Sequence, residues 1–280
     1  MTDRRRFLTL AAHLVGATLA TLSLTATLSG PAQASSLDDI QSRGTLRVAV
    51  PQDFPPFGSI GADMQPQGYD IDTARYLAEQ MKLDLSLVPV TSANRIPYLT
   101  TGKVDLVISS LGRNPDRARA IDFSDKYAPF FFGVFGDGAT DSDDGIEAPA
   151  DLAGKTIGVT RGALEDIELS KVAPENTVIK RFEDNATTIS AFLSGQVGLI
   201  ATGNQVAASI AARGGRHVPE LAFTLKDSPC YIGVAKNNPE LLARVDQLIQ
   251  DGMSDGTFNA LSEKWFKAPL PADFDAAGGH

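Results

Sequence analysis

The segment around residue 110 carries residue types that bind anions. Residues 107–124 read VISSLGRNPDRARAIDFS. The apolar run predicts a buried strand, Asn114 is a favourable helix N-cap, and Pro115 fits the first helical position. Arg117 then falls at the third helical position, close to backbone amides that have no partner within the helix. Because a planar guanidinium donates two parallel hydrogen bonds, this arrangement predicts a seat for a carboxylate.

Other residues of the segment fall into two groups. Ser109 and Ser110 offer hydroxyl groups, and Gly112 lets a ligand approach the backbone closely, so these three complete the predicted seat. Arg113 and Arg119 are expected to be ordinary solvated charges. The alternative interpretation of the whole segment is a solvated helix start whose arginines face water.

Short apolar strands alternate with amphipathic helices along the chain, in the same order in two halves. The first half predicts strands at 46–50, 83–90 and 105–109, with a helix at 70–81 that is N-capped by Asp70 and a short helix at 96–101. The second half predicts strands at 156–160, 177–182 and 197–201, with helices at 163–171 and 185–193. The repeated order predicts two similar units.

Alternation of this kind is typical of parallel sheets flanked by helices with right-handed crossovers. We therefore predict two α/β lobes with mixed, mostly parallel sheets joined by a two-strand hinge. A further strand at 231–236 and two helices follow the second half and are expected to return to the first lobe. The predicted lobes are 35–130 with 228–280, and 131–227.

Ligands of open parallel sheets bind beyond the carboxyl ends of the strands. Four loops meet that condition, two from each predicted lobe. They are 51–57, 109–117, 160–165 and 202–205. If the lobes face one another, these loops line one cleft.

Bulk composition excludes several classes of protein. The 280 residues carry a formal net charge of -9 with a pI near 4.8, which opposes a nucleic-acid-binding role because phosphate neutralisation needs a basic face. Cys230 is the only cysteine, so no intrachain disulfide can form. The three histidines do not suggest a metal cluster or a Ser/His/Asp set, and we expect no cofactor and no metal.

Residues 1–34 have the features of an export signal. Three arginines at 4–6 precede an apolar, threonine-rich stretch, and the small residues of PAQA predict cleavage after Ala34. The sequence DRRRFL resembles a twin-arginine motif, and ordinary Sec export is the alternative. We expect the mature protein to be periplasmic and monomeric.

Several ordered motifs resemble one protein family. They are RGTLRVAVPQDFPPFG, GYDIDTARYLAEQM, LTTGKVDLVISSL, NPDRARAIDFSDKY and DLAGKTIGVTRG. Together they resemble the amino-acid-type extracellular solute-binding proteins (family 3) that serve ABC importers, over residues 37–266. The resemblance implies a type II two-lobed receptor that closes about a hinge, holds its ligand between the lobes and meets a membrane permease.

The resemblance also implies roles for particular residues. In this family the arginine at the position of Arg117 holds the ligand α-carboxylate, and backbone and hydroxyl groups at Ser109, Ser110 and Gly112 share in ligand contacts. The aromatic residue at the position of Phe54 covers the ligand side chain. Phe57 better fits a place in the core.

Two departures from the family pattern concern the second lobe. Hydroxyl residues usually follow the GVxxG turn, but this chain has Ala163 and Leu164 there, so backbone amides remain, aided by Thr160. The aspartate that usually binds the ligand ammonium is absent, and Gly203 or Asn204 takes its place. A neutral amide accepts a hydrogen bond but cannot neutralise a buried ammonium.

Two explanations of the missing aspartate remain open. Asp53 or Glu165, each in a cleft loop, replaces it, or the ligand is not a standard free α-amino acid. For both residues the alternative is a charge on the solvent-facing rim.

The leading hypothesis is a receptor for a small carboxylate-bearing polar solute, an amino acid or a derivative. The alternative is a secreted cyclohexadienyl or arogenate dehydratase-like enzyme, which the same resemblance includes. Such an enzyme needs a general acid in the cleft, for which Glu165 is the candidate. A sensor lobe of a signalling protein is a third, weaker interpretation.

Overall fold

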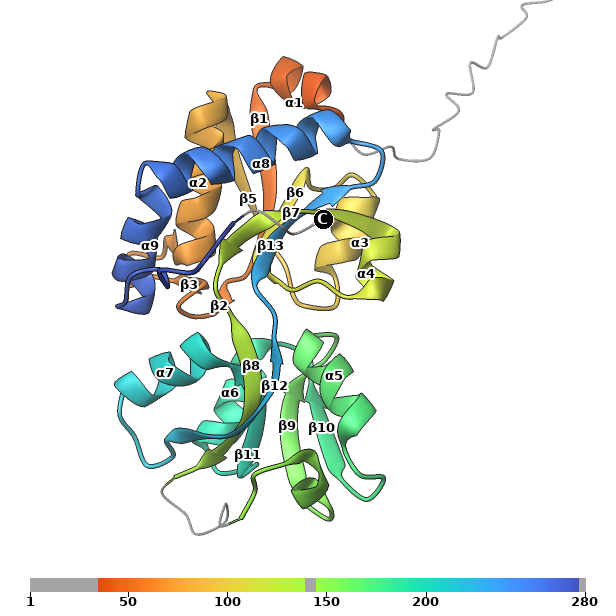
Figure 1. Ribbon diagram of the computed structural model, residues 1–280, viewed down its shortest axis with the longest axis vertical. Coiled ribbons are helices and arrows are strands. Elements are labelled where there is room, and N and C mark those ends of the chain that lie inside the picture. Colours follow the sequence, from red (N-terminus) through yellow and green to blue (C-terminus); the bar gives the residue numbers. More distant parts are fainter. Residues whose placement is uncertain (1–34, 139–144, 277–280) are drawn as a thin grey trace, which may run out of the picture. The chain divides into compact units, whose positions relative to one another are not determined.

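The computed structural model describes residues 35–138 and 145–276, and the predicted export signal lies outside these residues. The chain forms two α/β lobes, each built on a five-stranded sheet (Figure 1). The strand orders are β5-β1-β6-β13-β7 and β10-β9-β11-β8-β12, and β2, β3 and β4 form a small third sheet. In the described residues, no helix is long and apolar enough to cross a membrane.

The first lobe contains both ends of the described chain. Its elements are α1 (Leu37–Arg43), β1 (Thr45–Val50), β2 (Asp53–Phe54), β3 (Gly58–Ile60), β4 (Pro66–Gln67), α2 (Tyr69–Met81), β5 (Asp84–Pro89), α3 (Arg95–Thr100), β6 (Leu106–Leu111), α4 (Pro115–Ala120), β7 (Ile121–Ala128), β13 (Cys230–Ala235), α8 (Pro239–Ser254) and α9 (Thr257–Phe266). β1 pairs in parallel with β5 and β6, as the repeated strand-helix order predicts. β13 pairs antiparallel with β6 and β7, so the strand expected to return to this lobe does so.

The second lobe repeats the parallel core and adds two antiparallel strands. Its elements are β8 (Phe131–Asp137), η2 (Pro149–Leu152), β9 (Thr156–Thr160), α5 (Leu164–Val172), β10 (Val178–Phe182), α6 (Asn185–Leu193), β11 (Leu199–Gly203), α7 (Asn204–Ala212) and β12 (Pro219–Asp227). β9 pairs in parallel with β10 and β11, whereas β8 pairs antiparallel with β11 and β12. Both sheets are therefore mixed.

The chain crosses between the two sheets twice. It leaves the first sheet at β7 and enters the second at β8, and it returns from β12 to β13 (Figure 1). The two crossings are hydrogen-bonded to each other, because the Ser228 amide donates to the Phe130 carbonyl at 2.9 Å. A Cβ at Gly203 would overlap the Phe130 ring, so glycine is required where β11 meets the first crossing.

Asp70 does not cap α2, contrary to the sequence expectation. The helix begins at Tyr69 with Gly68 as its N-cap, and Asp70 lies in the first turn with a fully buried side chain. Its carboxylate accepts from the Ser110 amide at 2.8 Å and from the Tyr127 hydroxyl at 2.6 Å. The Asp70 carboxylate thus binds an amide 40 residues away instead of an amide of its own helix. A local sequence pattern does not reveal so distant a partner.

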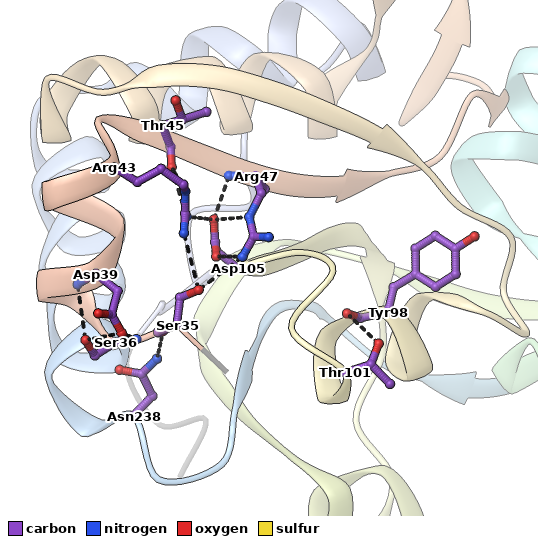
Figure 2. A network of polar contacts seen from close by, with 10 residues as sticks. All are labelled: Ser35, Ser36, Asp39, Arg43, Thr45, Arg47, Tyr98, Thr101, Asp105 and Asn238. Carbon is purple, nitrogen blue, oxygen red and sulfur yellow. Dashed lines mark hydrogen bonds and ion pairs between the residues drawn. The ribbon is translucent and has the colours of Figure 1, made fainter. Parts of the chain in front are cut away.

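Asp105 ties the start of the first lobe to the loop before β6 (Figure 2). Its buried carboxylate accepts from Arg43 at 2.6 Å and from Arg47 at 2.6 Å, and it also accepts from the Arg47 amide at 2.8 Å. Ser35 contacts both arginines through its hydroxyl oxygen. A carboxylate that accepts several charge-assisted bonds stabilises the strands it joins.

We expect Asp105→Ala to lower the free energy of unfolding by about 2 to 4 kcal/mol, because it leaves two guanidinium groups without their buried anion. Urea denaturation followed by circular dichroism measures the change. Asp116→Ala is the control, since Asp116 pairs with Arg119 on the surface with both side chains exposed. Its effect should stay below about 1 kcal/mol. Equal losses in the two variants would contradict this account of Asp105.

Candidate functional site

A small pocket lies where strands of both sheets end. It encloses about 20 Å³, close to the volume of one water molecule, so side chains from the two lobes nearly fill it. The lining residues are Pro51, Phe54, Val90, Ser92, Arg95, Ser109, Ser110, Gly112, Phe130, Thr160, Ala163, Leu164, Glu165, Asn185, Ala201, Thr202 and Ser228. The pocket thus lies beyond the carboxyl ends of the parallel strands, where ligands of such sheets bind. Most of the predicted site residues line it.

The local structure of the predicted anion seat is confirmed. Asn114 is the N-cap of α4, and its side chain accepts from the Arg117 amide at 2.8 Å, with Pro115 in the first turn. Arg113 and Arg119 are exposed, as expected for solvated charges. The sequence was sufficient here because a helix cap depends on residues three positions apart.

Arg117 is buried at the edge of the pocket but is not among its lining residues. It is 6% exposed, Nη1 donates to the Gly112 carbonyl at 2.8 Å, and Nη2 donates to the Gly162 carbonyl at 3.1 Å. Burial, and then the nearby Arg95 guanidinium, lower the pKa of Arg117 to about 9. The role of Arg117 as the carboxylate seat stays a prediction.

Gly112 lies at a close contact between this loop and the second lobe. A Cβ at this position would overlap Leu164 of α5 and the Ser228 hydroxyl. The glycine is therefore needed for packing between the lobes, in addition to the approach of a ligand that the sequence suggested.

Ser110 has an unusual backbone conformation in the pocket wall. Its φ is +40°, which side-chain-bearing residues rarely adopt, and its amide donates to the buried Asp70 carboxylate. Burial raises the pKa of Asp70 to about 7, opposed by the hydrogen bonds from Tyr127 and Ser110. Asp70 therefore fixes the direction of the Ser110 backbone from behind the pocket.

Glu165 is the only acidic residue among the described residues that line the pocket. It lies in the first turn of α5 and is 7% exposed. Burial raises the pKa of Glu165, against the opposing effects of its own backbone amide and the positive charges of Arg95 and Arg117. It can accept a proton or face a positive group on a ligand.

Asp53 lies between the lobes but outside the pocket lining. Its carboxylate accepts from the Asn185 amide at 2.8 Å, the Asn185 Nδ2 at 3.1 Å and the Ala186 amide at 3.2 Å. The side chain thus joins β2 to the N-terminus of α6 in the other lobe. Its predicted contact with the ligand stays a prediction.

Asn204 also lies away from the pocket lining. Its Oδ1 accepts from the Phe131 amide at 3.2 Å, at the first crossing between the lobes. Asn204 lines a second cavity of about 1000 Å³ beside this crossing. The role of Asn204 in ligand binding stays a prediction.

The remaining predicted residues line the pocket. Thr160 exchanges a hydrogen bond with the Thr188 hydroxyl at 2.8 Å, which orients its side chain at the end of β9. Phe54 is 7% exposed and lines the pocket, whereas Phe57 is fully buried in the core with its ring 6.0 Å from that of Phe54. Ala163 and Leu164 line the wall at the start of α5.

Arg95 and Ser92 are lining residues that the sequence reasoning missed. Both follow β5, which runs parallel to β1 and ends at the same edge of the sheet. The rule that selected the other loops applies equally to this one, so an arginine in the segment that follows β5, at the first position of α3, was the available signal. In the part of the chain that the structure describes, no group of three or more histidine, cysteine, aspartate or glutamate side chains could hold a metal ion.

Comparison with known proteins identifies the family. Residues 46–268 match the model of the bacterial extracellular solute-binding proteins, family 3. The chain belongs to this family. It is 25% identical to the L-cystine-binding protein TcyJ of Escherichia coli (strain K12) over 234 residues, which cover 84% of this chain and 87% of TcyJ. It is 32% identical to the glutamine-binding protein of Geobacillus stearothermophilus over 207 residues, covering 72% and 77% of the two chains.

One solved structure is similar to this chain in both fold and sequence. The ancestral amino acid-binding protein AncCDT-1, a precursor of cyclohexadienyl dehydratase, matches with a TM-score of 0.76 at 32% identity, covering 83% of this chain and 100% of that one. Other relatives, in Escherichia coli and Bacillus subtilis, are named as ABC transporter binding proteins for arginine and glutamine. The relatives are thus amino-acid-binding proteins, and the two-lobed family fold is the one seen here.

The raised pKa of Asp70 predicts a fall in stability between about pH 4 and pH 7. In that range the folded protein holds a proton on Asp70 that the unfolded chain has released, so the free energy of unfolding decreases as the pH rises. The loss is at most about 4 kcal/mol, since each pH unit between the two pKa values corresponds to about 1.4 kcal/mol. Urea denaturation at a series of pH values measures it, and Asp70→Asn should flatten the profile.

Asp72→Asn is the matched control in the same helix. Hydrogen bonds from Lys264, Trp265 and Arg75 outweigh partial burial and lower the pKa of Asp72. Its contribution is present above the usual aspartate pKa and is lost only as the pH falls below about 4. A profile that Asp72→Asn flattens between pH 4 and 7, and Asp70→Asn does not, would contradict the assignment.

Proposed function

We propose that this protein is a periplasmic receptor that captures a small carboxylate-bearing polar solute, an amino acid or a derivative, and delivers it to an ABC importer. The observation that carries the proposal is the pocket between the lobes, which combines buried guanidinium, hydroxyl and carboxylate groups with the aromatic ring of Phe54. Such a combination suits a small zwitterionic ligand, with donors for its carboxylate and an acceptor for its ammonium. The names of its relatives support an amino acid as the solute.

Several details belong to the same proposal. The lobes are taken to span residues 35–130 with 228–280, and 131–227, with the export signal cleaved after Ala34 and a monomeric mature protein in the periplasm. Arg117 holds the ligand carboxylate together with the Ser109–Gly112 backbone. Glu165 replaces the family aspartate opposite the ligand ammonium.

Native mass spectrometry of freshly purified protein tests the proposal by detecting a small molecule that copurifies with it. Calorimetric titration with the twenty L-amino acids then ranks them. We expect one or a few to bind tightly and saturably. Absence of binding by every amino acid, with no copurified carboxylate, would overturn the proposed function.

A dehydratase is the second candidate, because the carboxyl group of Glu165, which lines the pocket, has a raised pKa as a general acid requires. A relative described as a precursor of cyclohexadienyl dehydratase also favours testing it. Incubation with prephenate or arogenate should give no product if the protein is a receptor. Product formation that Glu165→Gln abolishes would establish the enzyme instead.

We expect Arg117→Ala to weaken ligand binding at least tenfold. A charged contact that loses one partner in a desolvated cleft typically loses about 2 to 5 kcal/mol, and this variant also removes the bonds to the Gly112 and Gly162 carbonyls. Arg119→Ala is the control on the exposed side of the same helix. Calorimetry with the ligand identified above measures both, and equal effects would mean that Arg117 is not the seat.

Binding should be accompanied by closure, because a cavity of about 20 Å³ cannot admit an amino acid without separation of the lobes. Small-angle X-ray scattering should give a smaller radius of gyration with ligand than without it. An unchanged radius on binding would contradict closure.

Asp53→Ala should weaken binding, since it removes three hydrogen bonds that form only when the lobes meet. Asp63→Ala, in an exposed turn of the same lobe, is the control.

A further inference from the structure

A second cavity, with a volume of about 1000 Å³, lies beside the first crossing between the lobes. Its walls come from both lobes, chiefly from α9 and the C-terminal segment of the first and from α7 of the second. Phe130 is the only described residue that lines both this cavity and the interlobe pocket. The cavity is therefore a separate space, and its volume suits a small organic molecule.

Short side chains on α7 leave this space open. Ala208 and Ala212 are one turn apart, so they share a face of the helix, and both line the cavity and are exposed. Trp265 and Phe266 of α9 line the same cavity. Because a methyl group projects little from a helix, the rings of α9 have no large side chain of α7 against them at these two positions.

The two rings of α9 are held in place by buried partners. The indole Nε1 of Trp265 donates to the Asp72 carboxylate at 2.8 Å. The ring of Phe266 stacks on that of Tyr69, which is fully buried, with 4.5 Å between the centroids. A ligand that packs against these rings would not have to order them first, which lowers the entropic cost of binding.

The C-terminal segment 269–276 supplies a further part of the wall. It lies beyond the family match, which ends at residue 268. The Lys126 amide donates to the Ala276 carbonyl at 3.1 Å and so joins the segment to β7. The apolar residues of this segment that line the cavity are Pro269, Pro271 and Phe274. This part of the wall is thus an addition of this chain to the matched family region.

The lining combines flat apolar groups with charges that cancel. Its aromatic rings are those of Phe130, Phe131, Trp265, Phe266 and Phe274. Its charged residues are the basic Lys126, Arg213 and Lys267 and the acidic Asp227, Asp273 and Asp275. Aromatic walls favour a planar apolar ligand through stacked and edge-on contacts. A ligand with a net charge would be desolvated here without a net opposite charge to compensate it.

We propose that this cavity is a second binding site, and that its ligand class is an uncharged planar aromatic molecule. The ligand packs against the rings of α9 and of the C-terminal segment and fills the space beside Ala208 and Ala212. This inference does not depend on the function proposed above, because the site is separate from the interlobe pocket.

Fluorescence titration with a matched pair of probes tests the proposal. N-phenyl-1-naphthylamine is uncharged, and 1-anilinonaphthalene-8-sulfonate adds a sulfonate to the same ring system. Trp265 is the only tryptophan of the chain, so its emission reports binding at this wall. We expect the uncharged probe to bind saturably and to quench Trp265, and the sulfonate to bind about threefold more weakly or worse.

Variants of the wall locate the bound probe. Ala208→Phe should weaken binding of the uncharged probe by about tenfold or more, because the larger side chain takes up cavity space from an exposed position. Phe274→Ala should also weaken it, since it removes one ring of the wall. Met64→Ala is the control, because Met64 is 76% exposed and is not a lining residue. Its effect should stay within about twofold.

Circular dichroism establishes that each variant is folded, and Phe274→Ala decides the question if Ala208→Phe does not fold. The proposal would be overturned by the absence of saturable binding, by equal or tighter binding of the sulfonate, or by binding that neither wall variant weakens. Size-exclusion chromatography with light scattering tests a different occupant. A dimer that Ala208→Phe dissociates would make the cavity an interface between copies of the chain and would also overturn the proposal.

Discussion

Desolvation of charge at the cleft is the constraint on which the arrangement of the two lobes depends. Arg117 is buried because its guanidinium donates to the Gly112 carbonyl of the first lobe and to the Gly162 carbonyl of the second. Both bonds need the lobes in contact, and the contact needs a glycine at 112, where any side chain would overlap Leu164. Separation of the lobes would return these groups to water. Contact between the lobes and burial of the charged groups therefore occur together.

A second buried charge connects the pocket to the crossings between the lobes. Asp70 accepts from the Ser110 amide in the pocket wall and from the Tyr127 hydroxyl, one residue before the end of β7. The Tyr69 hydroxyl in turn donates to the Tyr127 carbonyl at 2.7 Å. These buried hydrogen bonds connect the Ser110 backbone to the strand that leads into the other lobe.

Some features of the site were predictable from the sequence, and others were not. The cap of α4 and the burial of Phe57 were predictable, since each follows from neighbouring residues or from an apolar pattern. Arg95 was missed because the loop after β5 was not included among the strand ends. Asp70 was expected to cap its own helix, and its buried partners Ser110 and Tyr127 are tens of residues away in sequence.

The alternation of strands and helices, the return of β13 and the loops that line the pocket were predictable from the sequence alone. These features depend on hydrophobic periodicity and on short-range capping, which are local properties. Only the tertiary structure decided which charges face the pocket. In the folded protein the Asp53 carboxylate accepts a hydrogen bond from Asn185 of the opposite lobe, and Arg95 and Glu165 line the same pocket. The reason is that burial and ion pairing depend on contacts between segments more than 60 residues apart, and no local pattern records those contacts.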